Sequence, residues 1–259
     1  MTLTMGAGPL SATPPAATNY EITGPGHRLF FQDFPRRVRA VFGGLTLADT
    51  CAGKLLHETG ELPQLYVPEK DLRIELLEPS EHVTTCPFKG RATYWTVRAG
   101  DRAAPEAAWA YGELWWMRGY VALGWEAMDT WYDEAEEVRG HLRDPFHRVD
   151  VRASNRRVRV CLGGRIIADT GTPMVLSETG LPNRFYVPER DVRMDALEPS
   201  PARTVCPYKG EAVYWSLRLD GERLDDVAWS YPEPLESAAK AAGHLCFAHD
   251  RLTVEELLA

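Results

Sequence analysis

Residues 84–98 read TTCPFKGRATYWTVR, and residues 204–218 read TVCPYKGEAVYWSLR. Cys86 and Cys206, the third residue of each stretch, lie 120 positions apart in the chain. The same offset holds without a gap through about 45 preceding residues, with about half of the positions identical, which is typical of a chain built from two copies of one structural unit. The duplication therefore predicts two similar domains, and it singles out the residues that occur twice as candidates for a site.

The domain boundaries are predicted from this repeat and from local composition. We expect a disordered tail at 1–19, copy one at 20–125, an acidic linker at 126–146, and copy two at 147–259. We also expect copy two to end in a short amphipathic helix over 252–259, because Thr253 suits the N-cap and acidic residues follow it in the first turn.

The local sequence pattern within each copy indicates β-structure. Residues 157–162 alternate polar and apolar side chains, as a half-buried strand does, and a second apolar run follows Gly163 and Gly164. Paired glycines between two such runs predict a hairpin, and Gly43 and Gly44 repeat the signal in copy one. Short helices are expected after Pro68 and Pro188 and over 236–242. The predicted fold is mainly β, with two tandem copies of a small β-sandwich or barrel-like domain and one or two short helices in each.

The bulk composition excludes some classes of function. A net charge of −8 is unfavourable for non-specific nucleic-acid binding, which needs a cationic surface. No apolar run approaches the length needed to cross a bilayer, so no membrane association is expected. The cysteine count is odd, at five, and only one pair recurs between the copies, which favours reduced thiols in a cytoplasmic protein.

Several longer motifs recur in order along both copies and together resemble a known family. In copy two these motifs are CPYKG at 206–210, ETG at 178–180 and YVPE at 186–189, and in copy one they are CPFKG at 86–90, ETG at 58–60 and YVPE at 66–69. The chain resembles domain-of-unknown-function family 427 in its tandem form. The resemblance implies a compact, mostly β domain and no established reaction. The family has also carried a nucleotidyltransferase label, but the sequence contains neither a glycine-rich phosphate loop nor a Gly-Ser pair followed by paired aspartates.

The repeated Cys-Pro-aromatic-Lys-Gly stretch is the sharpest candidate for a site. Proline restricts one φ angle and glycine permits a positive one, so the stretch should form a tight turn that holds Cys206 near Lys209, and Cys86 near Lys89. An ammonium close to sulfur would activate the thiolate as a nucleophile. The alternative is that the cysteines are small buried hydrophobes and the lysines reach solvent or a carboxylate.

Other repeated side chains complete the candidate site. Glu58 and Glu178 precede Thr-Gly in both copies. Each could act as a general base, as the partner of the lysine, or as a structural carboxylate. The tyrosines that recur are candidates either for the core or for lining a ligand pocket, namely Tyr66, Tyr94, Tyr186 and Tyr214.

His244 occurs only in copy two. With Cys246 and His249 it suggests a metal site, but structural zinc usually takes four ligands and the chain lacks a Cys-x-x-Cys pair, so we expect no metal and no cofactor. If His244 faces the Cys206 turn, copy two alone would combine a cysteine, a lysine and a histidine.

These observations leave three functional classes open. The first is a small-molecule site beside the turn, with Cys206 as nucleophile, Lys209 stabilising its anion and Glu178 or His244 moving the proton, as in a thiol-dependent enzyme. The second is a non-catalytic binding module in which the lysine and the turn amides hold an anionic small molecule. The third is a structural adaptor for a protein partner.

Overall fold

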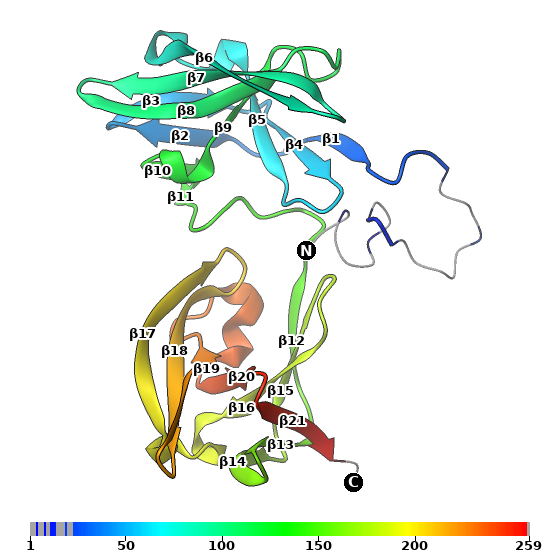
Figure 1. The fold of residues 1–259 in the computed structure, drawn as a ribbon, viewed down its shortest axis with the longest axis vertical. Helices are drawn as coiled ribbons and strands as arrows, with labels where there is room; N and C mark the ends of the chain where they lie inside the picture. The colour runs from blue at the N-terminus through cyan, green and yellow to red at the C-terminus, as the bar shows by residue number, and fades with distance from the viewer. Residues whose placement is uncertain (1–3, 5–7, 9–10, 14–18, 20–22, 258–259) are drawn as a thin grey trace. The chain divides into compact units, whose positions relative to one another are not determined.

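The structure of the chain is a computed structural model that describes residues 4, 8, 11–13, 19 and 23–257. The chain divides into two compact units, Met1–Asp144 and Pro145–Ala259, which correspond to the two copies. Each unit is built almost entirely of antiparallel strands (Figure 1). The mainly β, two-copy architecture predicted from the sequence is confirmed.

Copy one contains a large and a small sheet. The large sheet has seven strands in the order β1-β4-β5-β9-β8-β7-β6, and the small sheet has four in the order β11-β10-β2-β3. The strands are β1 (Leu29–Asp33), β2 (Val38–Phe42), β3 (Leu45–Thr50), β4 (Lys54–Glu58), β5 (Gln64–Pro68), β6 (Leu77–Cys86), β7 (Gly90–Ala99), β8 (Arg102–Tyr111), β9 (Tyr120–Leu123), β10 (Thr130–Asp133) and β11 (Glu136–Glu137).

Copy two repeats this plan with the large sheet β12-β15-β16-β20-β19-β18-β17 and the small sheet β14-β13-β21. Its strands are β12 (Val149–Ala153), β13 (Arg157–Leu162), β14 (Arg165–Thr170), β15 (Met174–Glu178), β16 (Arg184–Pro188), β17 (Leu197–Cys206), β18 (Gly210–Leu219), β19 (Glu222–Ser230), β20 (His244–Phe247) and β21 (Leu252–Leu257). The helices in the described part of the chain are all short 3-10 helices, η1 (Glu69–Asp71), η2 (Ile74–Leu76), η3 (Trp125–Ala127), η4 (Glu189–Asp191), η5 (Met194–Ala196) and η6 (Glu236–Ala241).

The large sheet of each copy packs a hydrophobic cluster on each of its two faces. Successive residues of a strand point to opposite faces, so Leu55 and Leu56 of β4 belong to different hydrophobic clusters. Leu55 packs with Ala40 and Leu47 of the small sheet, which makes the sandwich core. Leu56 packs with Tyr66 and other residues of the second face. The candidate site lies on this second face, away from the sandwich core.

The predicted glycine hairpins are confirmed. Gly43 and Gly44 join β2 to β3 with φ values of +59° and +74°, and Gly163 and Gly164 join β13 to β14 with φ values of +53° and +82°. Two consecutive positive φ angles define the type I′ turn, whose twist matches that of the flanking strands.

The C-terminal helix predicted over 252–259 is wrong. Residues 252–257 form β21, which pairs with β13 along its length, for example Val254 with Val160. An unpaired β13 would leave a row of backbone N–H and C=O groups without partners, and pairing outweighs the local helix signal of Thr253 and its acidic neighbours. The last two predicted helix residues, 258 and 259, lie outside the described part.

The predicted acidic linker at 126–146 is also wrong over much of its length. β10 takes the same place beside β2 that β21 takes beside β13, with Trp131 opposite Ala40. Trp131 is buried, stacks on Trp125 with ring centroids 4.4 Å apart, and donates its indole N–H to the carbonyl of Trp125 at 3.0 Å. The segment therefore completes the small sheet of copy one, because the burial of an aromatic side chain outweighs its acidic composition.

Most of the tail predicted as disordered at 1–19 lies outside the described residues, so that prediction is largely untested. Thr4 and Ser11, which are described, are buried. The carbonyl of Thr4 accepts the N–H of Gly60 at 3.2 Å, and the carbonyl of Ser11 accepts a hydrogen bond from Arg28 at 2.8 Å.

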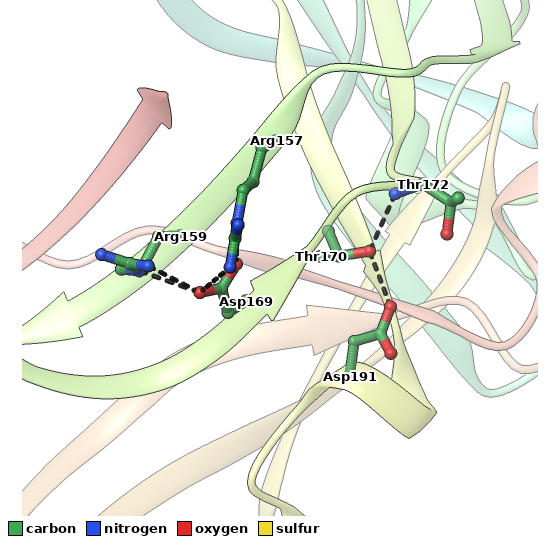
Figure 2. A network of polar contacts seen from close by, with 6 residues as sticks. All are labelled: Arg157, Arg159, Asp169, Thr170, Thr172 and Asp191. Atoms are coloured by element: carbon green, nitrogen blue, oxygen red, sulfur yellow. Dashed lines mark hydrogen bonds and ion pairs between the residues drawn. The ribbon is translucent and has the colours of Figure 1, made fainter. Parts of the chain in front are cut away.

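A polar network joins β14 to η4 in copy two (Figure 2). The hydroxyl of Thr170 donates to the carboxylate of Asp191 at 2.6 Å and accepts the N–H of Thr172 at 3.1 Å. Copy one repeats the first bond between Thr50 and Asp71 at 2.7 Å. Because each aspartate is held by a threonine hydroxyl, we assign the Thr170–Asp191 pair and its counterpart a structural role.

Candidate functional site

A histidine, a glutamate and a lysine meet on the second face of each large sheet. In copy one, Nε2 of His27 lies 2.9 Å from Oε1 of Glu58, and the ammonium of Lys89 forms an ion pair with Oε2 of the same carboxylate. In copy two, Nε2 of His147 lies 3.0 Å from Oε1 of Glu178, and the ammonium of Lys209 lies 2.5 Å from Oε2. We call each set of three residues the His-Glu-Lys cluster.

Backbone contacts from the Glu-Thr-Gly motif position the histidine and the glutamate. In copy two, the N–H of Arg148 donates to the hydroxyl of Thr179 at 2.9 Å, and the N–H of Thr179 donates to the carbonyl of Arg148 at 3.0 Å. His147 precedes Arg148, and Glu178 precedes Thr179, so these bonds bring the two side chains together. Copy one has the same two bonds between Arg28 and Thr59.

The tight turn predicted for the Cys-Pro-aromatic-Lys-Gly stretch is confirmed, and it delivers the lysine. The N–H of Lys209 donates to the carbonyl of Cys206 at 3.3 Å, closing the hairpin between β17 and β18. The carbonyl of Lys209 in turn accepts the N–H of Leu235 at 3.1 Å. Gly210 follows with φ +104°, a conformation that side chains with a Cβ rarely adopt.

The carboxylate of Glu178 is held in its ionised form. Burial by itself would raise its pKa, but hydrogen bonds from His147 and Lys209, with the charge of Lys209, lower the pKa from 4.5 to about 2. The side chains of Glu178 and Lys209 are 11% and 13% exposed, so the ion pair is largely shielded from water. Of the roles open for the glutamates, the structure shows that of partner of the lysine.

The two candidate cysteines begin the turns, but the lysine ammonium of each turn does not pair with the cysteine sulfur. Cys86 and Cys206 are half-buried free thiols. Each packs against the second-face cluster of its copy, which includes Ala92 and Tyr111 in copy one and Ala212 and Tyr231 in copy two. The lysine of each turn instead points to the glutamate.

The candidate tyrosines divide into two kinds. Tyr66 and Tyr186 are each only 1% exposed, and burial raises the pKa of both phenols. The hydroxyl of Tyr186 accepts the indole N–H of Trp229 at 3.2 Å. Tyr94 and Tyr214 are nearer the surface, and their hydroxyls hydrogen-bond to threonines of the neighbouring strand at 2.9 and 3.0 Å. The first pair is therefore core and the second lies at its edge.

His244 is placed away from Glu178. It pairs with Pro188 at the C-terminal end of β16, whereas Glu178, the last residue of β15, lies beyond Arg184 at the other end of β16. Pro188 lies four positions along the strand from Arg184, which is roughly 13 Å. The Nδ1 atom of His244 lies 2.7 Å from the carbonyl oxygen of Ala242. The histidine that reaches Glu178 is His147.

His27 and His147 were not among the site residues predicted from the sequence. The available signal was spacing, because the histidine precedes its glutamate by 31 residues in both copies and the two histidines are 120 positions apart. A His-Arg dipeptide opens each copy, but a contact over 31 residues depends on the pairing of β1 with β4 and of β12 with β15, which the spacing does not reveal.

A cavity of about 360 Å³ lies over the cluster of copy one. Its polar lining includes Glu58 and Lys89 with Glu61 and Gln64, and its walls are aromatic. The aromatic lining residues are Tyr66, Tyr94, Trp109 and Tyr111. The accessible lining of the cavity is mostly polar, with aromatic rings beside the charged groups, so it offers hydrogen-bonding partners and ring surfaces to a small molecule.

Two features are absent from the described residues of the chain. No group of three or more His, Cys, Asp and Glu side chains in this part of the chain is placed to hold a metal ion. No helix within the same residues has the length and apolar character needed to cross a membrane.

Together the fold and the repeated clusters define a tandem-duplicated, mainly β protein with one His-Glu-Lys cluster in each copy. A family model described as Domain of unknown function (DUF427) matches residues 31–134 and again 150–257, and the chain belongs to this family. A search of curated proteins found no match to the chain.

Proposed function

We propose that the protein binds a small molecule and that the cavity over Glu58 is its site in copy one. The observation that carries this proposal is the cavity itself. A largely buried Glu58–Lys89 ion pair lines a space of about 360 Å³ whose lining also includes four aromatic side chains. Burying charged groups beside a cavity is costly unless they are paired, and here each charge has its partner already in place.

The lysine contacts favour binding over thiol chemistry. A thiolate nucleophile needs a nearby cation or base, and the turn lysine was the candidate in each copy. Lys89 and Lys209 are instead paired with Glu58 and Glu178. We therefore assign the turn the role of holding the lysine against the carboxylate, with the cysteine as part of the packing around it.

The charge of the lining suggests the class of ligand. Copy one presents two carboxylates, Glu58 and Glu61, and one ammonium, Lys89. This lining has a net negative charge and disfavours an anion. A planar ligand that is neutral or cationic would stack on the aromatic walls and donate hydrogen bonds to the carboxylates.

Three probes of one shape test this proposal. Benzamidine, benzamide and benzoate are planar and differ mainly in charge, and each can be titrated into the full chain at millimolar concentration by ligand-observed NMR. We expect benzamidine to bind, and Glu61→Gln to weaken it severalfold because one carboxylate is removed from the lining. Glu136→Gln, at an exposed glutamate of β11, is the matched control and should leave binding unchanged.

The proposal fails if neither benzamidine nor benzamide binds. It also fails if benzamidine binds equally well to wild type, Glu61→Gln and a chain carrying Tyr94→Ala, because the ligand would then lie elsewhere. Circular dichroism of each variant establishes that the fold is retained before binding is compared.

A further inference from the structure

The two clusters are the same, but the residues around them differ in charge. The register pairs Leu56 with Gln64 in copy one and Leu176 with Arg184 in copy two, so Gln64 and Arg184 occupy equivalent places. Tyr94 pairs with Trp109, and Tyr214 pairs with Trp229, so the aromatic walls are equivalent as well.

Two positions change the charge between the copies. Glu61 of copy one corresponds to Leu181, and Gln64 corresponds to Arg184, at the constant offset of 120. Copy two therefore replaces one carboxylate by an apolar side chain and one amide by a guanidinium. The equivalent positions of copy two carry one carboxylate, one ammonium and one guanidinium, which is a net positive charge where the lining of copy one has a net negative charge.

Arg184 is placed to bind a ligand. Its guanidinium carbon lies 5.4 Å from the centroid of the Trp229 ring, and the residue is exposed. Trp229 is itself anchored by its bond to the hydroxyl of Tyr186. Over the described part of the chain, no ion pair joins Arg184 to a carboxylate, whereas other exposed arginines such as Arg148 and Arg157 each have one.

Lys209 lies on the same face as Arg184. Both cations act on the buried thiol of Cys246, whose pKa they lower against the larger effect of burial. Lys209 is neutralised by Glu178, whereas the guanidinium of Arg184 has no ion-pair partner among the described residues and is available to an incoming group.

We propose that copy two binds a small planar carboxylate, with Arg184 as the group that holds the anion and Trp229 and Tyr214 as the aromatic surface for its ring. This inference rests on the proposed function, because it assumes that the two clusters mark equivalent sites. The planar guanidinium matches the geometry of a carboxylate through two parallel hydrogen bonds, and its stacking on the indole limits its motion before binding. The two copies of the chain would thus bind ligands of opposite charge.

The experiment is a titration of benzoate into the full chain, with isothermal titration calorimetry or ligand-observed NMR as the measurement of binding. We expect benzoate to bind, and Arg184→Gln, which installs the residue that copy one has at this place, to weaken it at least tenfold. The same substitution should leave benzamidine binding unchanged. Arg190→Gln is the matched control, since Arg190 is an exposed arginine of η4 that donates to Thr172 at 3.2 Å, and it should have no effect on benzoate.

The reciprocal change adds a gain-of-function arm. Glu61→Leu with Gln64→Arg gives copy one the residues that copy two has at these two positions, and we expect this chain to bind a second equivalent of benzoate and to lose benzamidine binding. Benzoate binding that is unaffected by Arg184→Gln overturns the inference. Absence of benzoate binding in a chain that still binds benzamidine overturns it too, but leaves the proposed function standing. If the wild-type chain binds none of the three probes, both the inference and the proposed function are rejected.

Discussion

The ammonium of Lys209 lies 2.5 Å from Oε2 of Glu178, and Lys89 forms the same ion pair with Glu58 in copy one. Each pair joins the hairpin turn that carries the lysine to a strand end 31 residues away in the chain. The pair is therefore a tertiary contact that closes the second face of the sheet, and its energetics can be tested directly.

Removing the carboxylate of Glu178 should destabilise copy two. In Glu178→Gln, the cation of Lys209 loses its ionic partner while only 13% exposed, and His147 loses an anionic acceptor. We expect a loss of about 3 kcal/mol in the free energy of unfolding, the scale for breaking a buried ion pair from one side. Urea denaturation followed by fluorescence measures it. Glu198→Gln, which breaks an exposed pair with Arg218, is the control and should cost less than about 1 kcal/mol.

The same carboxylate should make stability depend on pH in the acid range. The pKa of Glu178 is lowered on folding from 4.5 to about 2, so the folded state binds fewer protons than the unfolded state between these values. The resulting stabilisation is complete above pH 4.5 and is lost as the pH falls towards 2, in total about 3 kcal/mol. Urea unfolding of copy two at several pH values measures it. In Glu178→Gln this part of the pH dependence should be missing, and an identical profile in both chains would refute the assignment.

Gly210 should be much less tolerant of a side chain than Gly164. Both have positive φ angles, +104° and +82°, so alanine is strained at either place. An added Cβ at Gly210 would also lie 3.0 Å from the carbonyl oxygen of Glu233, whereas at Gly164 it meets nothing within 4 Å. We expect Gly164→Ala to cost about 1 kcal/mol and Gly210→Ala about 2 to 3 kcal/mol in unfolding free energy. Equal losses would show that the contact with Glu233 relaxes without cost.

The five free cysteines should react with iodoacetamide in an order set by burial. Cys51 is exposed, while Cys246 is only 1% exposed and burial raises the pKa of its thiol to about 12. Native protein at mildly alkaline pH should therefore be alkylated first at Cys51 and last at Cys246, as read by peptide mass spectrometry. In denaturant the difference should disappear. Comparable native rates at the two cysteines would contradict the burial of β20.

Features that depend on neighbouring residues were predictable from the sequence. The glycine pairs gave the type I′ hairpins, since a positive φ at both central residues is a local requirement. The Cys-Pro-aromatic-Lys-Gly stretch gave the tight turn for the same reason. Pairing with the lysine was among the roles open for Glu58 and Glu178, because both acids recur with the lysines at a constant offset.

Features that depend on strand pairing were not predictable from the sequence. Residues 252–257 have a helix-start pattern and form a strand, because the edge of β13 needs a partner. Residues 130–133 are part of an acidic segment and form the equivalent strand in copy one. The histidines of the clusters reach their glutamates through the pairing of β1 with β4 and of β12 with β15.

The order of residues along the chain was sufficient to establish a duplicated β protein and the two tight turns of each copy, because periodicity and backbone preference act over a few positions. Only the tertiary structure decides which histidine meets each carboxylate. It also decides that the turn lysine contacts a carboxylate instead of the thiol. Those contacts join segments 31 residues apart, and their geometry depends on the register and curvature of sheets that no local pattern specifies.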